Sequence, residues 1–139
     1  MAWGFKRRKK RPRVDTHFLA HKELAREIVH ARVAHFNQGY SFSFGRISIK
    51  NQKRCWGSCS AKKNLNFNYK IIFLPEALMD YVIVHELCHL KELNHGAGFW
   101  EEVAKAIPSY KAERAHLRRI THVPATGFPS SVLQSLLKQ

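Results

Sequence analysis

Residues 80–100 of the chain read DYVIVHELCHLKELNHGAGFW, and this stretch predicts the helix around which the fold is built. His85, Glu86 and His89 form an HExxH motif within it. Positions four apart lie on the same face of an α-helix, so the two imidazoles can converge on one metal ion. Glu86 lies about 100° round the helix from His85, close enough to handle the protons of a metal-bound water.

A third imidazole follows where this helix is predicted to end. His95 lies between an Asn and a Gly, which tolerate the left-handed backbone of a helix C-terminus. Apolar residues surround the motif on almost all sides, so we expect the helix to be buried and its polar groups to need partners. Three protein ligands and one open position are typical of catalytic zinc. The sequence therefore predicts an open zinc site made by His85, His89 and His95, with Glu86 as catalytic base.

Other metal-binding or structural roles for these residue types fit the sequence less well. Cys55 and Cys59 with the two motif histidines would make a closed structural site, but the 25 residues between the pairs exceed the roughly 12 of a zinc finger. The motif histidines could instead be core residues bonded to backbone. His17 and His21 are another pair four apart, but no glutamate follows His17, which favours surface histidines.

Three imidazoles favour zinc as the metal, although Ni²⁺ or Co²⁺ would suit similar ligands.

The chemistry implied by an open site is hydrolysis. Zinc lowers the pKa of its bound water towards about 7 and polarises a carbonyl oxygen. Glu86 would take the water proton and deliver it to the leaving amine. Three residues are candidates for stabilising the oxyanion: Arg54, Tyr110 and His116.

Length and composition limit the class of protein. The 139 residues suit one domain, and no apolar run approaches the roughly 18 residues of a membrane span. Three cysteines, an odd number, together with an N-terminus lacking the features of a secretory signal, favour a reducing compartment. We therefore expect a cytoplasmic protein that is not inserted in a membrane.

Half of the net charge lies at the N-terminus. Residues 6–13 hold seven Lys and Arg residues, which supply seven of the 14 net positive charges. Such a run cannot pack, so residues 1–14 are predicted to be a disordered basic arm. The arm is either a nucleic-acid contact or a solubilising tail.

The rest of the chain predicts an α+β domain over residues 15–120. Apolar spacing predicts a scaffold helix that Asp15 or Thr16 caps and that ends near Asn37 and Gly39. Alternation then predicts three or four short strands in a small, mostly antiparallel sheet over residues 40–73, with a bulge or close backbone approach at 54–60. The motif helix starts near Pro75, with Asp80 a second cap, and two helices follow at 99–107 and 110–120. Residues 121–139 are predicted to be a C-terminal tail.

Several motifs together resemble the YgjP-like family of zinc metallopeptidases, relatives of the SprT-like and WLM proteases. They are WGSCS at 56–60, DYVIVHELCHL at 80–90, NH at 94–95 and FW at 99–100. The resemblance implies a zincin-type α+β domain acting on a peptide or protein substrate, with His85, His89 and His95 as ligands and Glu86 as base. SprT-like relatives act on proteins attached to DNA, so the basic arm suggests recruitment to nucleic acid. The alternative is a metal-containing nucleic-acid-binding module without peptidase activity.

Overall fold

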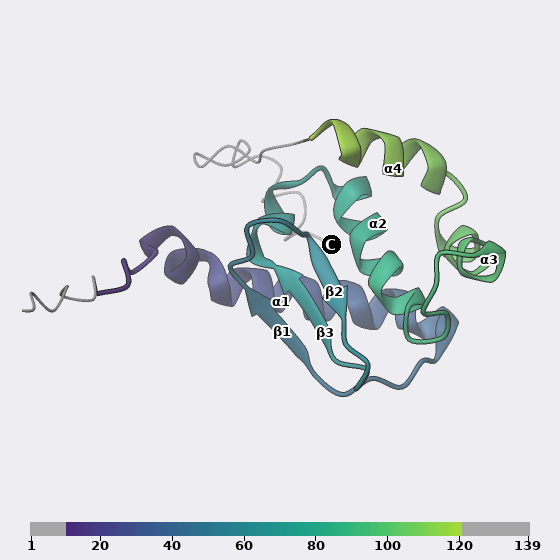
Figure 1. The fold of residues 1–139 in the computed structure, drawn as a ribbon, viewed down its shortest axis with the longest axis horizontal. Helices are drawn as coiled ribbons and strands as arrows, with labels where there is room; N and C mark the ends of the chain where they lie inside the picture. Colours follow the sequence, from purple (N-terminus) through teal and green to yellow (C-terminus); the bar gives the residue numbers. More distant parts are fainter. Residues whose placement is uncertain (1–10, 121–139) are drawn as a thin grey trace, which may run out of the picture.

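The computed structural model describes residues 11–120, which form an α+β domain as predicted. In chain order its elements are α1 (Thr16–Tyr40), β1 (Ile47–Lys50), β2 (Gly57–Cys59), β3 (Leu65–Asn68), the 3₁₀ helix η1 (Tyr69–Phe73), α2 (Glu76–Cys88), α3 (Ala97–Ala106) and α4 (Tyr110–Arg119). Figure 1 shows α1 running behind the sheet, with α2 beside the β2 edge and α4 across α2. The motif helix is thus packed between α1, the sheet and the two later helices.

Helix α1 begins as the sequence predicts and ends slightly later. The Asp15 carboxylate accepts a hydrogen bond from the Phe18 amide at 3.0 Å, which confirms Asp15 as the N-cap. The helix runs to Tyr40, and Ser41 ends it with a left-handed φ of 56°. Residues 41–44, where alternation suggested a fourth strand, form no strand, whereas the other three predicted strands are present. The Asn37 side chain instead accepts from the Phe42 amide and donates to the Phe42 carbonyl, so these polar groups are satisfied without a strand partner.

The sheet is mixed rather than mostly antiparallel, which corrects the prediction. Its strand order is β1-β3-β2, in which β3 pairs parallel with β1 and antiparallel with β2. β2 and β3 form a hairpin, and β3 lies in the sheet between the two earlier strands. Residues 57–59 of the expected bulge form β2, whose register pairs Gly57 with Phe67. Alternating polarity reveals strands but not their direction.

Helix α2 is buried on almost all sides, as its composition predicts. Nine of its residues are buried, including Glu86. Pro75 precedes its first turn, but Asp80 does not cap a second start. Asp80 lies inside the helix and accepts two hydrogen bonds from Arg32 of α1, at 2.9 and 2.7 Å. This bidentate ion pair joins the motif helix to the scaffold helix.

Some predictions fall outside the described residues. Of the predicted basic arm, only residues 11–14 are described, and all four are exposed. The predicted C-terminal tail, residues 121–139, lies outside the described part altogether. None of the helices within residues 11–120 has the length and hydropathy of a transmembrane span.

Candidate active site

Three imidazoles converge at the C-terminal end of α2. His85 lies in the last turn of the helix, and His89 is its C-cap. The helix ends earlier than predicted, and His95 comes from the loop between α2 and α3. The His89 Nε2 atom lies 3.2 Å from that of His85, and the His95 Nε2 atom lies 3.3 Å from His85 and 2.9 Å from His89. The structure therefore brings together all three histidines predicted as metal ligands.

The spacing of these nitrogen atoms suits a metal ion. A four-coordinate zinc ion with Zn–N bonds of about 2.0–2.1 Å places neighbouring ligand nitrogens about 3.3 Å apart. The other ring nitrogen of His89, Nδ1, lies 3.0 Å from the Glu92 carbonyl and can donate to it, which leaves the Nε2 lone pair facing the other two rings. Within residues 11–120, these histidines are the one group of three or more metal-binding side chains whose ligand atoms lie within 4.8 Å of one another.

Tyr81 is a further residue that contacts this group. Its hydroxyl lies 3.4 Å from Nδ1 of His85. A hydrogen bond there fixes the ring so that Nε2 faces the other imidazoles. Tyr81, His85 and His89 are spaced four residues apart on one helix face, and this spacing is the signal that could have revealed the contact.

Burial keeps the two helix histidines neutral. It lowers the pKa of His85 to about 3, and electrostatic interactions with His89, His95 and Arg114 act in the same direction. Burial also lowers the pKa of His89, against the opposing effect of its hydrogen bond to Glu92. Neutral imidazole is the form that binds a metal, so these rings need no deprotonation before binding.

Glu86 is the buried carboxyl group next to the histidines. Its exposed fraction is 6%, and burial raises its pKa to about 7. A carboxyl group with such a pKa can accept and release a proton near neutral pH. Its side chain lies against Gly57 of β2, where an added Cβ would be 3.0 Å from the Glu86 Cγ. The close approach predicted near this glycine is confirmed, and Glu86 is one of the groups that make it.

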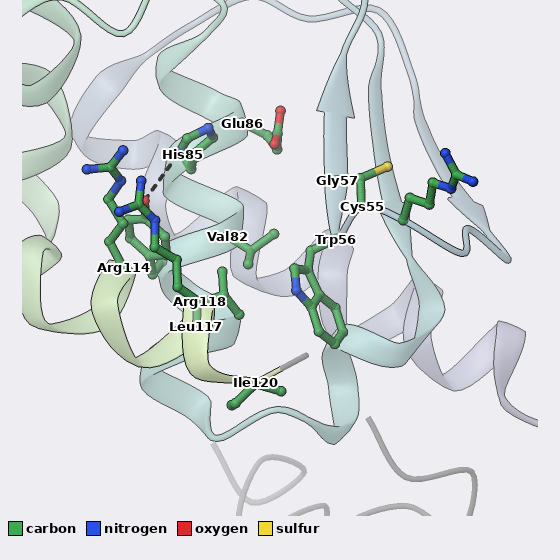
Figure 2. Close-up of a pocket in the computed structure, with 12 residues that line it drawn as sticks. Cys55, Trp56, Gly57, Val82, His85, Glu86, Arg114, Leu117, Arg118 and Ile120 are labelled. Atoms are coloured by element: carbon green, nitrogen blue, oxygen red, sulfur yellow. Dashed lines mark hydrogen bonds between the residues drawn. The ribbon is translucent and has the colours of Figure 1, made fainter. Parts of the chain in front are cut away.

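A cavity of about 430 Å³ opens beside His85 and Glu86. Figure 2 shows α2 between its two walls, with α4 on one side and the segment leading into β2 on the other. Twelve residues line it: Arg54, Cys55, Trp56, Gly57, Tyr81, Val82, His85, Glu86, Arg114, Leu117, Arg118 and Ile120.

Of the three oxyanion candidates, Arg54 alone lines this cavity. Tyr110 instead stacks on Trp100, with ring centroids 5.1 Å apart, and His116 is exposed on α4. Two arginines of α4, Arg114 and Arg118, also line the cavity, and no sequence motif indicates this because only the packing of α4 on α2 brings them there.

The competing metal sites are not assembled. Cys55 is exposed and Cys59 half-buried, and among residues 11–120 neither belongs to a cluster of three metal-binding groups. His17 contacts the Tyr69 hydroxyl through Nδ1 at 2.8 Å, and Nδ1 of His21 contacts the His17 carbonyl at the same distance. These hydrogen bonds account for both histidines without a metal.

The family model of the YgjP-like metallopeptidase domain matches residues 7–120, which include every residue of the site. The chain belongs to the YgjP-like metallopeptidase family. No curated protein sequence matches this YgjP-like chain.

Two crystal structures of metallopeptidase zymogens are similar to this YgjP-like domain. Abylysin of Pyrococcus abyssi has a TM-score of 0.58 and 27% identity, with 67% of this chain and 92% of that chain covered. Jannalysin of Methanocaldococcus jannaschii has a TM-score of 0.52 and 29% identity, with 69% and 93% covered. The zincin-like fold predicted from the resemblance is thereby confirmed.

Proposed function

We propose that this YgjP-like domain is a zinc peptidase that uses His85, His89 and His95 as ligands and Glu86 as general base. One observation carries the proposal: three Nε2 atoms meet within 3.3 Å of one another, and His85, one of the three, lines the same cavity as Glu86. Family membership supports a peptide or protein substrate.

The roles of the residues follow from their surroundings. Zinc, when bound, would acidify water and polarise the carbonyl of a peptide bond. The neutral rings of His85 and His89 present lone pairs at fixed positions, held by Tyr81 and the Glu92 carbonyl. The Glu86 carboxylate accepts the proton of the attacking water and returns it to the leaving amine. Burial of Glu86 keeps its proton affinity high enough for both steps.

The decisive experiment separates metal binding from catalysis. We expect Glu86→Gln to bind one equivalent of zinc, as the wild type does, while kcat/KM on a mixed peptide library falls by at least about 100-fold, because general-base catalysis contributes about 10²–10⁴-fold. His95→Ala should lose both zinc and cleavage. Glu101→Gln, which alters an exposed glutamate of α3, is the matched control and should behave as wild type.

Two outcomes would reject the proposal. Equal cleavage by wild type and Glu86→Gln would remove Glu86 from its role. Zinc binding and oligonucleotide binding by a wild type that cleaves no peptide would favour the alternative, a metal-containing nucleic-acid-binding module. The nucleic-acid contact through residues 6–13 and the cytoplasmic location both stay predictions.

A further inference from the structure

We propose that Arg114 and Arg118 of α4 form a subsite that binds a substrate carboxylate beside Glu86. The subsite would give the enzyme a preference for peptides with an acidic side chain or a free C-terminal carboxylate near the cleaved bond. This inference rests on the proposed peptidase function, because it assigns substrate selectivity to the same cavity.

The two arginines are placed by the helix that carries them. They lie four residues apart on α4, so both project from one helix face. Figure 2 shows their side chains extending from α4 towards the His85 side of the cavity. Both line the same cavity as His85 and Glu86. A carboxylate held by this pair would therefore lie next to the reacting groups.

Arg114 is held in place by an aromatic stack. Its guanidinium lies 4.9 Å from the ring centre of Trp100, and Trp100 stacks on Tyr110 with an interplanar angle of 14°. Tyr81 lines the same cavity as both arginines.

The charges of these arginines are not balanced within the described part of the chain. The ion pairs of residues 11–120 are made by Arg26, Arg32, Lys91 and Lys105, and neither α4 arginine takes part in one. Two like charges one turn apart repel each other, and an anion between them relieves this repulsion. Guanidinium groups match a carboxylate through two parallel hydrogen bonds.

The remaining wall of the cavity suits the apolar part of a peptide. Trp56, Val82, Leu117 and Ile120 line it together with the arginines. A volume of about 430 Å³ falls within the usual range of about 300–1,000 Å³ for ligand pockets. The cavity thus offers apolar surface for a side-chain stem and positive charge for its end.

The test measures peptide binding separately from cleavage. The probes are fluorescein-labelled decapeptides with an amidated C-terminus and an otherwise neutral sequence. In one series a single Glu occupies each position in turn, and in the matched series Gln replaces that Glu. A further pair of neutral peptides has a free or an amidated C-terminus, which separates the two sources of the carboxylate. Affinities are measured by fluorescence anisotropy with the zinc-loaded Glu86→Gln chain, alone or combined with Arg118→Gln, Arg114→Gln or Arg119→Gln. Arg119 is a neighbouring exposed arginine outside the cavity, so its variant is the matched control.

We expect at least one carboxylate peptide to bind about three- to tenfold more tightly than its neutral partner, the range for partly exposed charge-assisted contacts. Arg118→Gln should reduce this ratio to about one, Arg114→Gln should reduce it, and Arg119→Gln should preserve it. Arg118→Lys should retain part of the ratio, because it keeps the charge and loses the paired hydrogen bonds. In chains that keep Glu86, the ratio of kcat/KM for the carboxylate peptide to kcat/KM for its neutral partner should change in the same way in each arginine variant.

Three results would overturn the inference. They are equal affinities for charged and neutral peptides, a preference that survives in both Arg114→Gln and Arg118→Gln, and an equal loss of kcat on both peptide types. The last result would mean that the arginines act on the reacting carbonyl rather than on a substrate carboxylate. Arginine-dependent selectivity without any cleavage would reject the peptidase and leave the subsite standing.

Discussion

Gly57 and Glu86 are adjacent in space although 29 positions apart in the chain, and their contact sets the width of the site between β2 and α2. A Cβ atom at position 57 would lie 3.0 Å from the Glu86 Cγ, 3.1 Å from the Asn66 carbonyl oxygen and 3.3 Å from a Phe67 ring carbon. Two of these neighbours belong to the paired strand β3, which cannot yield without disturbing the ladder. Position 57 requires glycine because there is no room for a Cβ atom, and not because of its backbone conformation.

Gly57→Ala should therefore lower both stability and activity. We expect a loss of about 1–3 kcal/mol in the free energy of unfolding, as for other overpacked sites, and a fall in kcat/KM because Glu86 must move. Gly39→Ala is the control, since an added Cβ at that helical position meets nothing within 4 Å. It should be neutral or slightly stabilising. Denaturant unfolding of both variants measures the difference, and an unaffected Gly57→Ala would contradict the packing described.

At the scale of residues, the sequence predicts a contact correctly where one helix and the loop after it set the distance between the side chains. His85, His89 and His95 were predicted to meet, and their Nε2 distances confirm that they do. Their role as ligands stays a proposal. Arg114 and Arg118 were not found, because their place in the cavity depends on how α4 packs across α2, and no local pattern encodes that packing.

At the scale of elements, the joint between α1 and α2 determines where the motif helix lies. Arg32 donates two hydrogen bonds to Asp80, and the side chains of the pair are only 20% and 15% exposed. The neighbouring carboxylate of Glu76 lies 3.9 Å from the same guanidinium. Hydrogen bonding and charge attraction from Asp80 raise the pKa of Arg32 despite its partial burial. The pair fixes α2 against the scaffold helix one turn before the first histidine.

Arg32→Met should destabilise the domain by about 1–3 kcal/mol, because it leaves the Asp80 carboxylate partly buried without its partner. Arg26→Met offers a matched change on the same helix. Arg26 forms only an exposed ion pair with Glu23 at 3.9 Å, so its loss should cost less than about 0.5 kcal/mol. Thermal and urea unfolding provide the comparison. Similar losses in the two variants would mean that the joint is held by apolar packing alone.

Helices were predicted more accurately than strands, for physical reasons. The apolar spacing of α1 and α2 is set by burial of one or all helix faces, and both helices begin where the sequence predicts, although α1 ends slightly later and α2 earlier than expected. The alternation after Tyr40 resembled a strand, but the Asn37 side chain satisfies the Phe42 backbone instead. Alternation carries no information about strand order or direction, so it does not reveal that β3 lies between β1 and β2 and runs parallel to β1.

At the scale of the whole molecule, the candidate metal centre joins the end of α2 to the loop that leads into α3. A ligand that binds only the folded state stabilises it, by about 2.7 kcal/mol at a free concentration 100 times Kd. For a domain of this size, such a gain raises Tm by on the order of 10 °C. Zinc should therefore raise the Tm of the wild-type chain, and EDTA should reverse the shift.

The same titration with His89→Ala should produce little or no shift, since one of the three converging nitrogens is removed. Mg²⁺ serves as the second control, because it prefers oxygen ligands and should leave the Tm of the wild type unchanged. Differential scanning fluorimetry over a range of free zinc concentrations measures all three cases. A wild-type Tm that does not depend on zinc would argue against a metal at these histidines.

The strand order also determines the sequence of events by which the chain folds. β3 is synthesised last of the three strands and lies between the other two, so β1 has no place in the sheet until residues 65–68 have emerged. Short loops close sooner than long ones, which favours pairing of β2 with β3 before β1 joins. Since β2 carries Gly57, the surface that receives Glu86 is expected to form early, and α2 then docks on a hairpin that already exists.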